Sequence, residues 1–192
     1  MNYMRKFFVT LQVMDNSFLD SFERTLEEGL RKLCAGAGFL KEGYLDFQDV
    51  SEKWNEYIKD YVADAVENFN EYPEVALAWA AFLGMGVAHN WDEDWEIHSK
   101  DAYSDYYGPR GFDDMDENVL YNILKLDRET AGKLSETMDS CAVAALGLLR
   151  HQGIESQTAE GFFALSRSYS VMFRIGAEIE LRRLGYKMVR IR

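Results

Sequence analysis

The chain has 192 residues, of which 47% are hydrophobic and 14% aromatic, and its formal net charge is −12. This length suits one domain, and this hydrophobic content supplies a core, which argues against disorder over most of the chain. The negative charge argues against nucleic-acid binding, because phosphate would be repelled and no basic stripe compensates. The longest uncharged run, residues 75–88, is too short to cross a bilayer. We therefore expect a soluble, cytoplasmic protein with no membrane association.

The first element predicted is a long helix. Apolar residues recur in three- and four-residue steps from Met4 to Leu33, along one helical face. Gly36 and Gly38 are expected to end this helix, as glycines commonly do. Residues 1–14, which include FFVTLQV, also alternate as a strand does, so their secondary structure stays open.

Two further helices are predicted on either side of Pro73. Asp49 stands three residues before Glu52, as in a capping box, and an apolar stripe continues from there to Phe69. Pro73 is favoured in the first turn of a helix and is expected to open the next one. Because the loop between these helices is short, they are expected to pack as neighbours or to bend sharply.

The helix that starts at Pro73 is expected to be buried all round, because the segment VALAWAAFLGMGVA has no polar face. Small side chains recur in it at four-residue spacing and predict a groove for a closely packed helix: Ala76, Ala80, Gly84 and Ala88. The expected partner is the helix over 128–151, whose centre CAVAALGLL is also apolar. Asp127 is predicted to cap that helix and Thr158 to cap the last one. The inner face of the last helix is expected to begin at Phe162.

The pattern as a whole predicts an all-α single domain over residues 1–192. It would be a bundle of about six helices around two central apolar helices, approximately 73–97 and 128–151. A long acidic-aromatic loop is expected at 98–113 and a basic tail at 186–192. Helix should exceed about 60% of residues, against roughly one third in an average globular protein. Cys34 and Cys141 lack metal-binding spacing and are expected to be buried thiols.

Acidic and aromatic residues are most concentrated between Trp91 and Glu117, where ten acids and six rings accompany only two bases. This mixture suits a contact surface for a basic protein or a pocket for a cationic ligand. Alternatively, the rings cover the open end of the core while the acids face water. Tyr106 and Tyr107, beside the Gly108-Pro109 turn, are expected to be exposed. The predicted binding surface comprises Trp91, Asp92, Asp94, Trp95, Tyr103, Tyr106, Tyr107, Arg110, Asp113 and Asp116.

A metal site is the sharper alternative. If the helix continues past residue 90, His89, Glu93 and Glu96 share one face at spacings of four and three, and imidazole with carboxylates can hold zinc, iron or manganese. The Glu-x-x-His pairs of di-iron bundles do not occur in the chain. Arg174 and Glu178 are spaced for an ordinary ion pair, although with Arg167 they could instead line an interior pocket.

Two functions follow from these patterns. The favoured one is a non-enzymatic, cofactor-free protein-binding module, which engages a basic partner through the acidic-aromatic surface as an immunity protein or antitoxin would. No nucleophile elbow and no glycine-rich phosphate loop occur in the sequence, which supports that choice. The alternative is a metal-dependent enzyme with its site near His89, Glu93 and Glu96.

Overall fold

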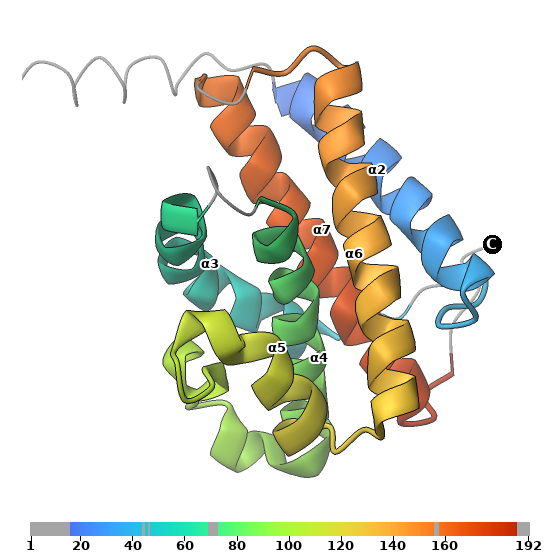
Figure 1. Ribbon diagram of the computed structural model, residues 1–192, viewed down its shortest axis with the longest axis vertical. Coiled ribbons are helices and arrows are strands. Elements are labelled where there is room, and N and C mark those ends of the chain that lie inside the picture. Colours follow the sequence, from blue (N-terminus) through green and yellow to red (C-terminus); the bar gives the residue numbers. More distant parts are fainter. Residues whose placement is uncertain (1–15, 44, 46, 69–72, 156–157, 188–192) are drawn as a thin grey trace, which may run out of the picture.

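The computed structural model describes residues 16–43, 45, 47–68, 73–155 and 158–187, and these form an all-α bundle (Figure 1). Helices hold 81% of the described residues, which confirms the predicted fold class, and the described part contains no strand. The alternatives left open for residues 1–14, and residues 188–192 of the predicted tail, lie outside this part. The long helices are α2 (Asn16–Gly36), α3 (Gln48–Asn68), α4 (Pro73–His98), α6 (Arg128–His151) and α7 (Ala159–Arg183).

Short helical turns connect α4 to α6. Two 3-10 turns come first, η2 (Tyr103–Tyr106) and η3 (Phe112–Asp114), followed by α5 (Met115–Glu117) and a π-helical turn, η4 (Asn118–Ile123). The segment 98–113, predicted to be one long loop, thus contains two helical turns. The carboxylate of Asp127 accepts a hydrogen bond from the Thr130 amide at 2.9 Å and caps α6. The Thr158 hydroxyl accepts one from the Gly161 amide at 3.0 Å and caps α7, so both predicted caps are confirmed.

Two glycines set the centre of the bundle, where α4 and α7 touch backbone to backbone. A Cβ atom on Gly84 would lie 2.0 Å from the carbonyl oxygen of Phe173. A Cβ atom on Gly176 would lie 1.9 Å from the carbonyl oxygen of Ala81. No side chain fits at either position, so the two backbones approach as closely as helices can.

The partner of α4 differs from the predicted one. We expected the helix over 128–151, which is α6, but α4 packs far more extensively on α7. The reason lies in the glycines of α7 and α6, the two helices that pack on α4. Gly176 of α7 faces the α4 backbone, whereas a Cβ on Gly132 or Gly147 of α6 would meet nothing within 4 Å. The central pair is therefore α4 and α7, and α6 packs beside it.

The outer helices lie on opposite sides of this pair. In Figure 1, α3 lies to the left, and α2 and α6 lie to the right. The predicted stripe of α3 from Val50 onward is buried as far as Ala65. Phe162, placed by the sequence on the inner face of α7, is instead 39% exposed, whereas Gly161, Ala164 and Leu165 beside it are buried.

The central contact predicts opposite effects for two glycine-to-alanine substitutions. Gly84→Ala forces α4 and α7 apart and should lower the free energy of unfolding by about 1–3 kcal/mol, as overpacking does. Gly147→Ala places its methyl group in open space and should raise that free energy by up to about 1 kcal/mol, the helix penalty of glycine. Urea unfolding followed by circular dichroism measures both, and equal stability of the two variants would contradict the close contact.

Candidate binding surface

The acidic end of α4 is built around a break in the helix at Asp94. Its φ of −163° and ψ of 91° are extended rather than helical, so α4 consists of two helical pieces. The Asp94 carboxylate accepts a hydrogen bond from the Ile97 amide at 3.2 Å, which starts the second piece in the manner of an N-cap. Around the break the exposed carboxylates point to water: Asp92, Glu93, Asp94 and Glu96.

The rings of this region do not share that exposure. Tyr103 and Tyr106 are 5% and 1% exposed, so the prediction that they belong to a contact surface is wrong. The reason is α3, whose Tyr57 and Tyr61 pack against them with ring centroids 5.8–6.1 Å apart. Tyr107, also expected to be exposed, is half-buried, and its hydroxyl donates a hydrogen bond to Asp64 of α3. Trp91 and Trp95 are half-buried as well.

Hydrogen bonds fix α3 along the acidic end of α4. The Trp91 indole N–H donates to Asp49 at 3.2 Å. The Lys53 ammonium donates to the Ser99 carbonyl at 2.8 Å, and the Tyr57 hydroxyl donates to the Asp101 carbonyl at 2.6 Å. The exposed acids of α3 are thereby brought beside those of α4.

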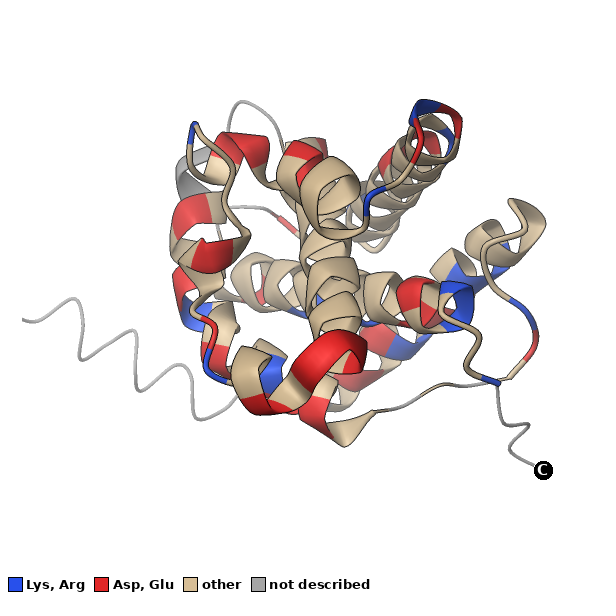
Figure 2. Ribbon diagram, turned by 90° about the horizontal axis from the view of Figure 1, so that it is seen from below, with Lys and Arg blue, Asp and Glu red and all other residues tan. Residues whose placement is uncertain are grey.

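We call the resulting surface the acidic face. Its exposed carboxylates are Asp49, Glu52, Glu56 and Asp60 of α3, the four acids around the α4 break, and Asp105. Across residues 49–60 and 91–105, ten carboxylates oppose three lysines, which leaves a net charge of −7. Figure 2, which looks onto this end of the molecule, shows acidic segments along the left and lower parts of the view and basic ones mainly on the right.

Sequence reasoning missed the four acids of α3. The sequence does indicate that these acids form one group, because residues 49, 52, 56 and 60 are spaced by three, four and four and so share one side of a helix. Their position beside the α4 acids, however, depends on how α3 packs. Local sequence patterns contain no information on that packing.

The remaining predicted surface residues stabilise the loop that follows. Arg110 is exposed, but its backbone amide and its Nε both donate to Asp114, at 2.9 and 2.5 Å. The Arg110 guanidinium lowers the pKa of the buried Asp114 carboxyl. Asp113 is exposed, whereas Asp116 is half-buried, and burial raises the pKa of its carboxyl. The Arg110–Asp114 pair therefore holds the turn in place, and the half-buried Asp116 adds little to the acidic face.

The predicted metal ligands are not brought together. The His89 Nδ1 lies 2.8 Å from Glu180 Oε1 of α7, and Arg183 also donates to both oxygens of that carboxylate at 2.6 Å. Glu93 and Glu96 are exposed and separated by the break at Asp94, so the continuous helix that the metal site needed does not exist. Among the described residues, no three histidine, cysteine or acidic side chains are placed to hold a metal ion.

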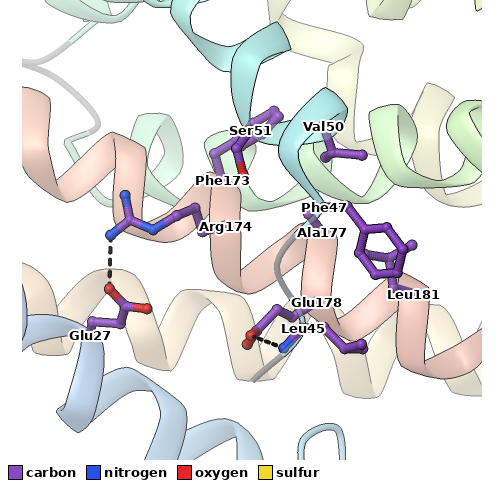
Figure 3. A pocket seen from close by; sticks show the side chains of 10 residues that line it. All are labelled: Glu27, Leu45, Phe47, Val50, Ser51, Phe173, Arg174, Ala177, Glu178 and Leu181. Carbon is purple, nitrogen blue, oxygen red and sulfur yellow. Dashed lines mark hydrogen bonds and ion pairs between the residues drawn. The ribbon is translucent and has the colours of Figure 1, made fainter. Parts of the chain in front are cut away.

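A partly open pocket of about 340 Å³ lies between α2, α3 and α7 (Figure 3). Arg174 donates to Glu23 and Glu27 of α2 at 2.8 Å each, and Glu178 pairs with Arg31 and accepts from the Leu45 amide at 3.0 Å. Arg174 and Glu178 thus do not pair with each other but line a pocket that is partly open to solvent, while Arg167 lies elsewhere. Burial raises the pKa of Glu178, and Arg31 opposes that rise. These charges are engaged with one another, and most of the remaining lining residues are apolar.

Comparison with protein-family models, with curated proteins and with solved structures gave no match. None of the described helices combines the length and the apolar character needed to span a membrane. The acidic face is therefore interpreted from its own chemistry.

The buried tyrosines behind the acidic face predict a loss of stability in alkali. Burial raises the pKa of Tyr107 to about 12 and raises the pKa values of Tyr57, Tyr103, Tyr106 and Tyr169 further. A phenol whose pKa is higher in the folded than in the unfolded state favours unfolding once the unfolded chain ionises. The free energy of unfolding should therefore fall as pH rises above about 10.

Tyr169→Phe provides the matched variant, because the buried Tyr169 hydroxyl has no hydrogen-bond partner among the described residues. Removing this hydroxyl should leave stability at neutral pH unchanged or raise it by about 1 kcal/mol. It should also make the alkaline loss shallower. Urea titrations from neutral pH to pH 11 measure both, and parallel pH profiles for the two proteins would contradict the assignment.

Proposed function

We propose that the protein is a non-enzymatic binding module that captures a basic protein partner through the acidic face. The observation that supports this most directly is the net charge of −7 over residues 49–60 and 91–105, where nine of the ten carboxylates are exposed and eight lie on the packed helices α3 and α4. Such a field attracts a basic partner over about 8 Å at physiological ionic strength and increases its association rate.

The rigidity of the surface also supports binding. Trp91 is held by its hydrogen bond to Asp49 and by ring contacts with Phe47 and Tyr186, at centroid distances of 4.6 and 5.7 Å. Half-buried Trp and Tyr side chains that are already fixed lose little conformational entropy on association, and such rings commonly dominate interface energies. Trp91, Trp95 and Tyr107 thus offer apolar contacts at the edge of the charged area.

A basic toxin neutralised by an immunity protein or antitoxin is the concrete form of this partnership that we propose. The acidic face would then cover a cationic surface of the toxin and block its access to a target. We place the encounter in the cytoplasm, where thiols stay reduced. Cys34 and Cys141 fit that location, because both are free and buried with their sulfur atoms 3.6 Å apart.

Reversing charges on the acidic face tests the proposal. The probe is an immobilised lysine-rich peptide, compared with the same peptide after every lysine is changed to glutamine. Wild-type protein should bind only the lysine form, with an association rate that falls as salt rises. The triple variant Glu52→Lys, Glu93→Lys, Glu96→Lys should bind about tenfold or more weakly, because close charge pairs couple by a kcal/mol or more.

The matched control is the triple variant Glu28→Lys, Glu136→Lys, Asp139→Lys. It changes net charge by the same amount through exposed acids of α2 and α6, on the opposite side of the bundle from α3 (Figure 1). It should keep most of the binding. If both triple variants weaken binding equally, net charge alone is responsible and the acidic face is not a binding site. Thermal melts of all three proteins should agree closely, since exposed carboxylates contribute little to stability.

A further inference from the structure

A second surface, distinct from the acidic face, is an apolar groove between α3 and the first half of α7. Its volume is about 490 Å³. The residues that line it are Trp54, Asn55, Ile58, Lys59 and Val62 of α3, and Phe162, Phe163, Ser166, Arg167 and Ser170 of α7. Phe162 is 39% exposed there, which is unusual for a phenylalanine on a helix that is otherwise central to the core. Within the described part of the chain, nothing fills this groove.

The position of α2 indicates what does fill it. Arg167, on the wall of the groove, donates to Glu23 at 2.5 Å and to Asp20 at 3.4 Å, so the first turns of α2 lie at the groove's edge. Asp20 is only four residues, about 6 Å of helix, from Asn16, where α2 begins. The fifteen residues that precede α2 therefore start beside the groove.

The sequence of that segment suits the groove. Its apolar residues recur in three- and four-residue steps, as on one face of a helix: Met4, Phe7, Phe8, Leu11 and Met14. A helix over residues 7–14 would be about 10 Å long, and Phe162 to Ser170 on the groove wall spans about 12 Å. An amphipathic helix whose apolar face lies in a groove between two other helices is a recurrent mode of recognition.

The proposed pairing rests on apolar contact rather than on charge, because the charged residues that line the groove, Lys59 and Arg167, are both basic. Residues 1–15 contain Arg5, Lys6 and Asp15, a net charge of +1, and all three lie outside the apolar stripe of the segment. We propose that residues 4–14 of the chain bind in the groove between α3 and α7 of the same molecule, with Phe7, Phe8 and Leu11 against Phe162, Ile58 and Val62. The N-terminal segment then acts as an internal ligand that covers the apolar groove.

Tryptic cleavage in the intact chain tests this binding, because Arg5 and Lys6 are the only trypsin sites before α2. In the wild-type protein cleavage after Lys6 should be slow. Phe162→Asp puts a charge in the groove and should speed that cleavage about tenfold or more, since proteolysis follows the population of the released segment. Val143→Asp is the matched control, because Val143 is 59% exposed on α6, away from the groove. In this variant cleavage after Lys6 should be as slow as in the wild-type protein.

Hydrogen exchange tests the same contact from the other side. Leu11→Asp should release the segment and increase amide exchange in residues 54–62 and 162–170. Gln12→Asp adds the same charge outside the apolar stripe and should leave exchange in both segments unchanged. Equal exchange in both variants and in wild type, or equally fast cleavage after Lys6 in all proteins, overturns the proposal.

Sedimentation equilibrium shows whether the segment in the groove belongs to the same molecule or to a second copy of the chain. A monomer mass at every concentration, together with slow cleavage after Lys6, supports binding within one molecule. A dimer whose dilution speeds that cleavage overturns the proposal, because the segment would then fill the groove of a second copy. These outcomes are independent of the acidic face, whose charge-reversal test uses other residues.

Discussion

The direct contact between the backbones of α4 and α7 is the constraint on which the rest of the structure depends. Gly84 and Gly176 leave no space for a side chain between the two helices, so their relative position is set by steric exclusion of everything larger than hydrogen. The other long helices then pack around this pair. The position of α4 also decides where its polar end leaves the core, because residues up to Ala88 are buried and the break at Asp94 lies in solvent.

Charges divide between two kinds of environment. Within the bundle they are paired, mostly between helices: Glu180 with His89 of α4, Glu178 with Arg31 of α2, and Arg174 with Glu23 and Glu27 of α2. Arg183 adds a pair with Glu180 within α7. Such buried pairs contribute modestly to net stability, but losing one partner is costly, so they specify how α2 and α4 meet α7. The acidic face is different, because its carboxylates are exposed to water and ten acids there face only three lysines.

The acidic face and the apolar groove both involve α3, on different sides of it. One side presents acids beside the end of α4, and the other presents Trp54, Ile58 and Val62 beside α7. Tyr57 and Tyr61 lie between these sides and fill the space behind the acidic face. A partner bound to the acids and an N-terminal segment bound in the groove would therefore both contact this helix.

Local patterns in the sequence were sufficient to predict the helices, because periodicity and caps such as Asp127 and Thr158 act within a few neighbouring residues. They also predicted that Gly84 lies at a close contact. Tertiary structure decided the rest. Gly176 made α7 the partner of α4, α3 buried Tyr106 and placed its own acids beside those of α4, and Glu180 paired with His89. Such outcomes depend on complementary surfaces of segments far apart in the chain, and the pattern of one segment carries no information about the surface it will meet.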